Sequence, residues 1–149
     1  MEYKRLQDIC ENFDAMRKPI TAKDRIEGDI PYYGASGIVD YVNDYIFDDE
    51  YLLVSEDGAN LVMRSTPIAF SISGKTWVNN HAHVLQSKPE MADNKFLAYS
   101  ISQADIEALL VGGGRAKLNA EVMMGIDLVM PSLPEQIAIG RYLTQLDDL

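Results

Sequence analysis

Two histidines in close succession are the first residues of this sequence whose type and spacing could do chemistry. His81 and His83 lie two positions apart, so on an extended strand both imidazole rings face the same side, as a pair of metal ligands requires. The sequence offers no convincing third ligand beside them. With Asn79 and Asn80 just before them, a polar loop-to-strand edge is the better functional interpretation, and hydrogen-bonded structural histidines fit better than a metal site. We therefore expect no metal site. A nuclease function is the third of three hypotheses because it rests on these two residues alone.

A run of three glycines, Gly112–Gly114, is the second candidate for chemistry. It precedes Arg115 and Lys117, and flexible backbone N–H groups beside two cations suit a nucleic-acid phosphate, while a flexible helix C-cap is an equally good explanation. The spacing matches neither Gly-x-x-x-x-Gly-Lys-Ser/Thr nor Gly-x-Gly-x-x-Gly after a strand, which argues against an NTPase. Because no Cys-His nucleophile pair, Gly-x-Ser-x-Gly or Asn-Pro-Pro-Tyr-type methyltransferase motif occurs, we expect no catalytic residue.

The charge of the chain is strongly acidic and unevenly distributed. Thirteen Lys and Arg residues stand against 23 Asp and Glu, a net charge of −10, which at first argues against nucleic acid because phosphate contacts need cations. Acidic residues crowd Asp40–Asp57, whereas Gly58–Pro89 contains none and so leaves room for a local basic surface. The acidic run is most simply a solvated face, and it could also oppose a basic partner subunit or mimic DNA phosphates.

Length and composition indicate one domain. With 149 residues and 47% hydrophobic content, the chain can bury a substantial core as a single unit. Cys10 is the single cysteine, which excludes an internal disulfide and makes it a small buried residue. The sequence has no apolar run of about 18 residues and no signal-peptide stretch, so we expect a cytoplasmic protein without a membrane partner.

The segment Gly28–Gly37 is predicted to organise the rest of the chain. Pro31 fixes its own φ and favours extended backbone before it, so a strand runs into a glycine-rich turn, and Tyr32 and Tyr33 leave a constrained backbone in defined directions. Leu6–Phe13 fits either a strand or a helical turn. Short strands are predicted where β-branched and aromatic residues lie between turn signals, over Ile38–Val54, Pro67–Ile72, Trp77–Leu85 and Ile126–Met130.

Helical spacing replaces the strand pattern after Pro89. Two short helices are expected, one about Phe96–Ile101 and one about Ile106–Leu110, with Ser102 as the cap of the second. Asn119 is placed to cap a further short turn. These elements predict an α+β fold: a single mixed domain with a central set of short twisted strands, short helices after residue 94, and the start of a long C-terminal helix.

A capping box begins the C-terminal helix. Ser132 and Glu135 form the Ser-x-x-Glu pattern, with Pro134 in the first turn, where its missing N–H costs little. An apolar stripe on one face continues to the end of the sequence, which predicts that the helix packs on a partner or has been cut short. The stripe consists of Ile139, Tyr142, Leu143, Leu146 and Leu149.

Six short segments stand out in order along the chain: Arg17–Ile20, Gly28–Gly37, Leu53–Asn60, Gly74–His83, Lys117–Asn119 and Leu133–Gln136. Each is weak alone, but in this order they resemble the target recognition domain of type I restriction-modification DNA specificity subunits over nearly the whole chain. The resemblance implies a protein that recognises a DNA sequence and catalyses no covalent reaction itself. It also implies that residues 1–131 form the DNA target recognition domain and that residues 132–149 begin a spacer or dimerisation helix.

The resemblance further implies a set of partners. These are double-stranded DNA, a methyltransferase subunit that carries S-adenosylmethionine and methylates adenine, and a separate motor-nuclease subunit that cuts, with no cofactor in this chain. Subunits of the family usually hold two such domains, each reading one half of a bipartite site. This sequence has one domain and only the start of the spacer helix, so it looks like half a subunit or a fragment; a half subunit would pair with a second copy and read a palindromic site.

Base readout needs paired donors and acceptors on loops, so polar loop residues are the candidates for DNA contact. Lys75, Arg115 and Lys117 are assigned mainly to phosphates and the others to bases, while a basic methyltransferase partner could supply most phosphate contacts. The alternative, from another class, is an acidic interaction or decoy protein that occupies a partner's DNA channel. The candidate DNA-binding residues are Tyr32, Tyr33, Ser36, Lys75, Asn79, Asn80, His81, Arg115, Lys117 and Asn119.

Overall fold

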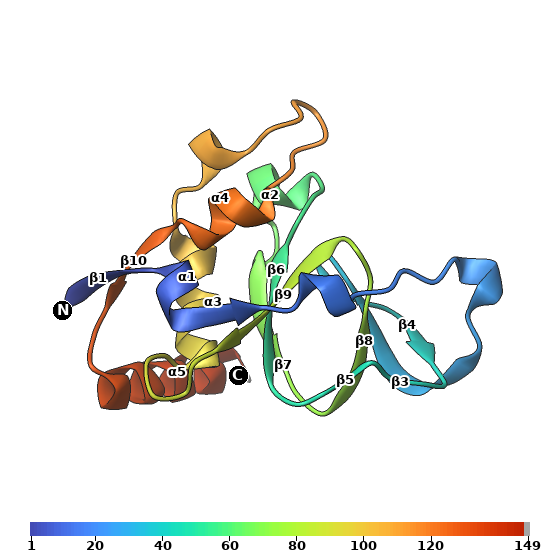
Figure 1. The fold of residues 1–149 in the computed structure, drawn as a ribbon, viewed down its shortest axis with the longest axis horizontal. Helices are drawn as coiled ribbons and strands as arrows, with labels where there is room; N and C mark the ends of the chain where they lie inside the picture. The colour runs from blue at the N-terminus through green and yellow to red at the C-terminus, as the bar shows by residue number, and fades with distance from the viewer. Residues whose placement is uncertain (148–149) are drawn as a thin grey trace.

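Strands form the middle of this protein, and the two longest helices lie together at one end (Figure 1). The computed structural model describes residues 1–147, and no helix among them is long and apolar enough to cross a membrane. The strands, helices and 3-10 turns (η) follow one another as β1 (Glu2–Arg5), α1 (Leu6–Ile9), β2 (Cys10–Asn12), η1 (Asp14–Met16), η2 (Ala22–Asp24), β3 (Glu27–Gly34), β4 (Gly37–Val42), β5 (Phe47–Asp48), β6 (Tyr51–Ser55), α2 (Asn60–Met63), β7 (Ala69–Ile72), β8 (Lys75–Val78), β9 (Ala82–Ser87), α3 (Asn94–Gln103), η3 (Glu107–Leu109), α4 (Ala120–Met124), β10 (Asp127–Met130) and α5 (Leu133–Asp147).

Two four-stranded sheets share an apolar cluster. The first sheet has the strand order β2-β9-β6-β7 and is antiparallel throughout. The second has the order β4-β3-β8-β5, in which β3 and β8 run parallel. Phe47 and Val78 of the second sheet lie in one cluster with Leu53 and Val84 of the first. The predicted α+β class, with short strands at the centre, is therefore confirmed.

Strand β6 is the centre of the core because it is buried on both faces. Leu53 belongs to the cluster shared by the two sheets, whereas Leu52 and Val54 belong to a second cluster that includes residues of α1, α3, α4 and β10. Side chains alternate across a strand, so burial on both faces requires an apolar residue at each successive position. The run Tyr51–Val54 meets that requirement, and every residue of β6 is buried.

Two segments that the sequence treats as single elements are divided in the structure. Leu6–Phe13 contains both α1 and β2, so neither of the two readings holds alone. The strand predicted over Trp77–Leu85 is interrupted by a turn between β8 and β9, in which the side chain of Asn79 accepts a hydrogen bond from the backbone N–H of His81 (2.8 Å). The prediction that His81 and His83 share one face of a strand is therefore wrong.

The two short helices predicted after Pro89 are one α-helix and one 3-10 turn. α3 continues through Ser102, whose hydroxyl bonds to the backbone N–H and carbonyl of Ala69 at 3.2 Å, so Ser102 does not cap a second helix. The C-terminal carbonyls of α3 are satisfied by Arg64, which donates to Ser102 and Ala104 at 2.7 Å each. Asn119 does stand at the N-cap of α4, but its side chain makes no capping hydrogen bond.

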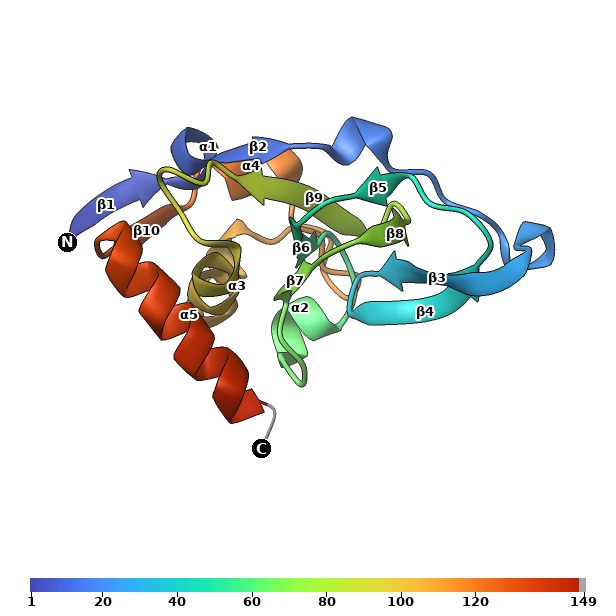
Figure 2. The same ribbon diagram turned by 90° about the horizontal axis from the view of Figure 1, so that it is seen from below.

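The capping box of α5 is confirmed, and this helix packs on α3 (Figure 2). Ser132 Oγ lies 2.8 Å from Glu135 Oε1 and accepts the Glu135 N–H at 3.4 Å. The buried residues of α5 are Gln136 and Gly140. Of the predicted partner-binding stripe, Ile139, Tyr142 and Leu146 are exposed, Leu143 is half-buried, and Leu149 lies outside the described residues.

Gly140 is where α5 comes very close to the start of α3. A Cβ atom there would lie 2.7 Å from Asp93 Oδ2 and 3.2 Å from the Phe96 nitrogen, and Asp93 is the N-cap residue that accepts the Phe96 N–H. We expect Gly140→Leu to lower the free energy of unfolding by about 1–3 kcal/mol, because the larger side chain displaces this cap. The control is Ala138→Leu, at an exposed position of the same helix, and urea unfolding measures the free energy of unfolding of both variants. Equal losses in the two variants would contradict the close packing at Gly140.

Candidate nucleic-acid interface

Several segments that carry candidate recognition residues meet at Ser55–Gly58, here named the junction segment, which begins at the end of β6. The Ser55 hydroxyl donates a hydrogen bond to the carbonyl of Ala35 in the β3–β4 turn (2.5 Å). The Glu56 N–H donates to the carbonyl of His81 in the β8–β9 turn (2.9 Å). Two turns that are far apart in the sequence are thus held against one short segment.

The glycine loop is attached to the same junction segment. The Leu118 N–H donates to the Glu56 carbonyl (2.7 Å), and the Gly58 N–H donates to the Ala116 carbonyl (3.0 Å). Residues 111 and 117 pair with each other, so the loop between them is a small hairpin. Ser36, Asn80, His81 and the loop that carries Arg115 and Lys117 are therefore anchored around the junction segment.

The three glycines form the tip of this small hairpin. Gly112 and Gly113 adopt φ values of +94° and +56°, a region that favours glycine, and the Arg115 N–H bonds back to the Gly112 carbonyl at 3.1 Å. The helix C-cap that the sequence left open is therefore wrong, because a hairpin turn uses these residues. Arg115 and Lys117 both remain exposed on it.

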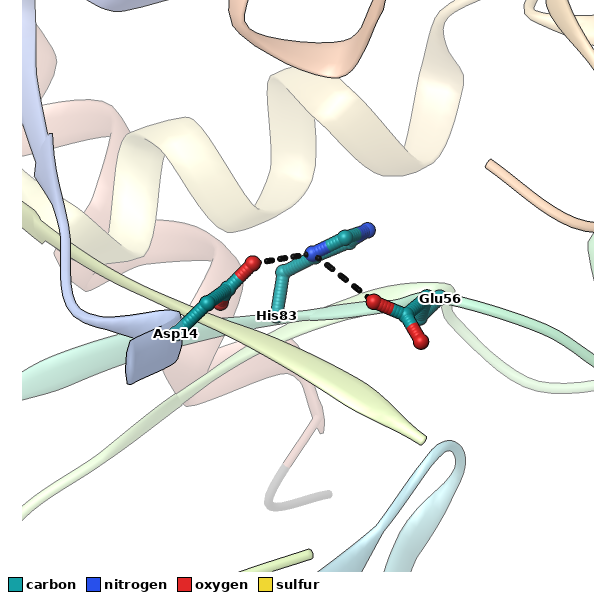
Figure 3. A group of neighbouring side chains, drawn as sticks. All are labelled: Asp14, Glu56 and His83. Atoms are coloured by element: carbon teal, nitrogen blue, oxygen red, sulfur yellow. Dashed lines mark hydrogen bonds and ion pairs between the residues drawn. The ribbon is translucent and has the colours of Figure 1, made fainter. Parts of the chain in front are cut away.

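A buried polar cluster lies beneath the junction segment (Figure 3). His83 on β9 is 0% exposed; its Nδ1 lies 2.7 Å from Asp14 Oδ2, and its Nε2 lies 2.7 Å from the Leu118 carbonyl oxygen. The His83 ring is therefore held between the Asp14 carboxylate and the Leu118 carbonyl, one on each ring nitrogen. Its ring joins η1 to the end of the glycine loop.

Arg17 completes the charge balance of this cluster. Its guanidinium lies 3.2 Å from Glu56 Oε1 and 3.8 Å from Asp14 Oδ1, and it also donates to the Ala82 carbonyl (3.1 Å). The carboxylates of Asp14 and Glu56 therefore face the Arg17 guanidinium and the His83 ring. Buried ion pairs are retained at little cost only when both charges are compensated and hydrogen-bonded in this way.

The same cluster presents the donor atoms of a metal site. One atom from each of Asp14, Glu56 and His83 lies within 4.8 Å of the others. However, His83 Nδ1 already bonds to Asp14, and Arg17 lies against the Glu56 oxygen that faces His83. These contacts already satisfy the carboxylate oxygens without a metal ion, and we assign the cluster a structural role.

Asp14 is expected to make stability depend on acid pH. Burial alone would raise the pKa of its carboxyl, but hydrogen bonds from His83 and the Val84 N–H, with the charges of His83 and Arg17, outweigh burial and hold the pKa below its usual value of 3.8. A carboxyl whose pKa is lower in the folded than in the unfolded state stabilises the fold at any pH above its unfolded-state pKa. This stabilisation is lost as the pH falls through its pKa in the folded state. Because Asn does not titrate, we expect Asp14→Asn to be less stable than wild type at pH 7, with the difference shrinking below about pH 4. Urea unfolding across this range measures it, and a constant difference would contradict the assignment.

Two predicted DNA-binding residues lie in the core, which corrects their assignment. Tyr32 is 1% exposed; its hydroxyl accepts the Ile20 N–H (2.9 Å), and the Arg25 guanidinium lies 4.6 Å from the ring centroid. Asn79 is 8% exposed, and its side chain holds the β8–β9 turn. The cause is strand alternation together with the turn, which direct both side chains inward, so neither can reach DNA in this structure.

The other predicted residues differ in where they lie. His81 projects from its turn with Nδ1 2.9 Å from the Asp57 carboxylate, and Asp57 in turn forms a β-bridge with Lys117. Lys75 does not join this group, because it lies at the other end of β8 with its ammonium 4.9 Å from the centroid of the Tyr45 ring. Tyr33 is half-buried. Six of the predicted DNA-binding residues are exposed and lie on, or next to, segments attached to the junction segment: Ser36, Asn80, His81, Arg115, Lys117 and Asn119.

Reasoning from sequence missed the residues that build this site. Asp14 is separated from His83 by 69 positions, and Arg17 from Glu56 by 39, so no local spacing connects them. Asp57 was assigned to an acidic run, whereas the structure pairs it with His81. The available signal was the order of whole segments, because Arg17–Ile20 and Leu53–Asn60 both belong to the pattern of the resemblance.

Relatives of known family support the resemblance. A family model described as the type I restriction modification DNA specificity domain matches residues 1–149. A protein of Haemophilus influenzae named as a type I restriction enzyme specificity subunit is 35% identical over 149 residues, which is 100% of this chain and 38% of the relative. A type I specificity subunit of Mycoplasma pneumoniae is 27% identical over 152 residues, covering 97% of this chain and 39% of the relative.

Solved structures show the same fold. The S subunit of a type I restriction-modification system from M. genitalium has a TM-score of 0.77 at 17% identity, covering 99% of this chain and 39% of that chain. The HsdS subunit from Thermoanaerobacter tengcongensis has a TM-score of 0.56 at 14% identity, covering 99% of this chain and 37% of that chain. This chain thus spans less than two fifths of the proteins that it matches. Because the family model covers its whole length, the chain belongs to the type I restriction-modification DNA specificity domain family.

Proposed function

We propose that this chain is a sequence-specific DNA recognition module of a type I restriction-modification system and that it reads one half-site. The observation that carries the proposal is the attachment of separate turns, with exposed polar side chains, around one junction segment in a member of the specificity family. Residues 1–131 act as the target recognition domain and 132–149 as the start of the spacer helix. The chain catalyses no covalent reaction itself and needs no cofactor or metal.

The reactions belong to partner subunits. A methyltransferase subunit that binds S-adenosylmethionine methylates adenine in the recognised sequence, and a motor-nuclease subunit cuts. The net charge of −10 supports this division of roles. An acidic domain gains little binding free energy from DNA phosphates, so a partner subunit has to supply most of the phosphate contacts. Base edges are read by Ser36, Asn80, His81 and Asn119, while Arg115 and Lys117 contact phosphates.

The exposed stripe of α5 is the proposed partner surface. Ile139, Tyr142 and Leu146 are exposed, and they provide an apolar face for a helix of the methyltransferase subunit or of a second copy of this chain. Pairing with a second copy would place two half-site readers about a two-fold axis. The recognised sequence would then be palindromic.

Lys117→Ala should weaken DNA binding by a similar factor for all sequences. In complex with the methyltransferase subunit, loss of one phosphate contact lowers the slope of log affinity against log salt by about 1. Lys75→Ala is the matched control, since Lys75 lies away from the junction segment and its loss should leave the slope unchanged. Binding isotherms at several salt concentrations measure both, and an unchanged slope for Lys117→Ala would remove this residue from the contact surface.

Methylome sequencing with and without the gene tests the function itself. Loss of one defined methylated motif supports sequence recognition, and an unchanged methylome in that cell refutes it. The decoy hypothesis predicts instead that the protein competes with DNA for the methyltransferase and confers no methylated motif. Two members of the acidic run argue against the decoy, because Asp40 and Glu56 pair with Arg25 and Arg17 of the same chain and are not free to mimic phosphates.

A further inference from the structure

Strand β10 has one edge paired with β1 and one edge free. The Leu6 N–H donates to the Ile126 carbonyl (2.9 Å) where this pair begins. Backbone groups of an antiparallel pair alternate between the two sides, so those of Asp127 and Val129 point away from β1. Within residues 1–147, the outward N–H and C=O groups of these two residues have no hydrogen-bond partner. They form a short row of free donors and acceptors.

A groove of about 620 Å³ lies along this free edge. β10 forms one wall, and α3 forms the other through Phe96, Tyr99 and Gln103, which recur at helical spacing on one face. Ile106 and Leu128, both almost completely buried, also line the groove. In Figure 2, β10 lies between β1 and α3, which agrees with this arrangement.

We propose that this groove binds an extended peptide segment of a partner protein, which adds to β10 as a third strand. The main chain of the segment bonds to the outward groups of Asp127 and Val129, and alternate side chains enter the space beside α3. Asp105 and Asp127 line the groove, Asp127 with the Arg5 guanidinium of β1 3.9 Å away, and no lysine or arginine lines it within the described residues. The segment therefore alternates apolar residues with lysine or arginine.

The chemistry of the groove favours a strand over other occupants. A helix from a partner would fill the apolar wall but would leave the row of backbone groups on β10 unpaired. Nucleic acid would bring phosphates to two aspartates. The groove shares no residue with the junction segment or with the exposed stripe of α5, so this site is independent of the DNA recognition proposed above.

Peptides test the proposal on the unmodified chain. The probe is acetyl-Lys-Ile-Lys-Val-Lys-Ile-amide, titrated into isotope-labelled protein and followed by amide NMR shifts. We expect shifts at Asp127, Val129 and Tyr99. Two control peptides carry backbone N-methyl groups, one on every Lys and the other on every apolar residue. In an added strand only alternate N–H groups face β10, so one control peptide should bind about tenfold more weakly than the parent and the other should bind like the parent. Equal binding of the two versions, or shifts confined to other surfaces, overturns the proposal.

Variants of the protein give a second readout. Val129→Pro removes one outward N–H and is compatible with an edge strand, whereas Val129→Ala keeps that N–H. We expect Val129→Pro to weaken peptide binding about tenfold and Val129→Ala to change it little. If the NMR spectrum of Val129→Pro shows that this variant is unfolded, Tyr99→Lys is the test. Tyr99 is 43% exposed, so a lysine there places a cation in the groove and should repel a basic peptide. Wild-type binding by a folded Val129→Pro or by Tyr99→Lys refutes strand addition.

Discussion

Replacing His83 with leucine is expected to lower the free energy of unfolding by about 3–5 kcal/mol, because removing one member of a buried polar cluster leaves its partners without their hydrogen bonds. The Asp14 carboxylate would lose its 2.7 Å hydrogen bond from Nδ1, and the Leu118 carbonyl would lose its bond from Nε2. Urea unfolding followed by circular dichroism measures this loss. The expected effect is a large fraction of the stability of a domain of this size.

His81→Leu is the matched control for this prediction. Both histidines bond to an aspartate, but the His81 side chain is 50% exposed and the His83 side chain is 0% exposed. An exposed pair of this kind is worth about 0–1 kcal/mol. Similar losses for the two variants would show that the buried cluster is not a stabilising unit. Asp14→Asn should also cost less in the His83→Leu background than in the wild type, since the two residues share one interaction.

Gly28→Ala is expected to disrupt the ribbon formed by β3 and β4 and to lower the free energy of unfolding by about 3 kcal/mol, at the upper end of overpacking effects. A Cβ atom at this position would lie 2.5 Å from the Asn43 Cα and closer still to the Val42 carbonyl oxygen. The obstacle is backbone on the paired strand, which cannot rotate away as a side chain can. Amide NMR spectra should show the largest shifts in β3 and β4.

Gly34→Ala provides the comparison within the same strand. Its nearest neighbour is the Val39 Cγ1 atom at 3.1 Å, the end of a side chain that has other rotamers. We expect a loss of about 1 kcal/mol or less at this position. If Gly34→Ala is as damaging as Gly28→Ala, backbone contact is not the reason that glycine occurs at residue 28.

The parts of the fold that sequence could predict are those set by local chemistry. The capping box at Ser132 and Glu135 needs only residues three apart, and the apolar run Tyr51–Val54 indicates a strand by itself. The division of Trp77–Leu85 could be read only in part: Asn79 and Asn80 indicate a loop-to-strand edge, but the β-branched and aromatic residues on both sides fit one long strand. The Asn79 side chain overrides that preference by bonding to the backbone two residues on.

The candidate site was only partly predictable. Its turns were found because their order resembles a family, but Tyr32 was assigned to DNA although its partner, the backbone of Ile20, lies in a connection that has no regular pattern. His83 was seen as half of a histidine pair, whereas its real partners are Asp14 and Leu118. Contacts between residues so far apart depend on the packing of both sheets, which a pattern of spacings does not contain.

The way the recognition turns are attached to the junction segment bears on how new specificities could arise. The links from Glu56 to His81, from Leu118 to Glu56 and from Gly58 to Ala116 join main-chain atoms, which every residue other than proline supplies. Exposed side chains on the attached turns, such as those of Ser36 and Asn80, can therefore be exchanged without loosening the frame that presents them. A lineage could then change the side chains that these turns expose by point substitution while keeping its stability and its geometry.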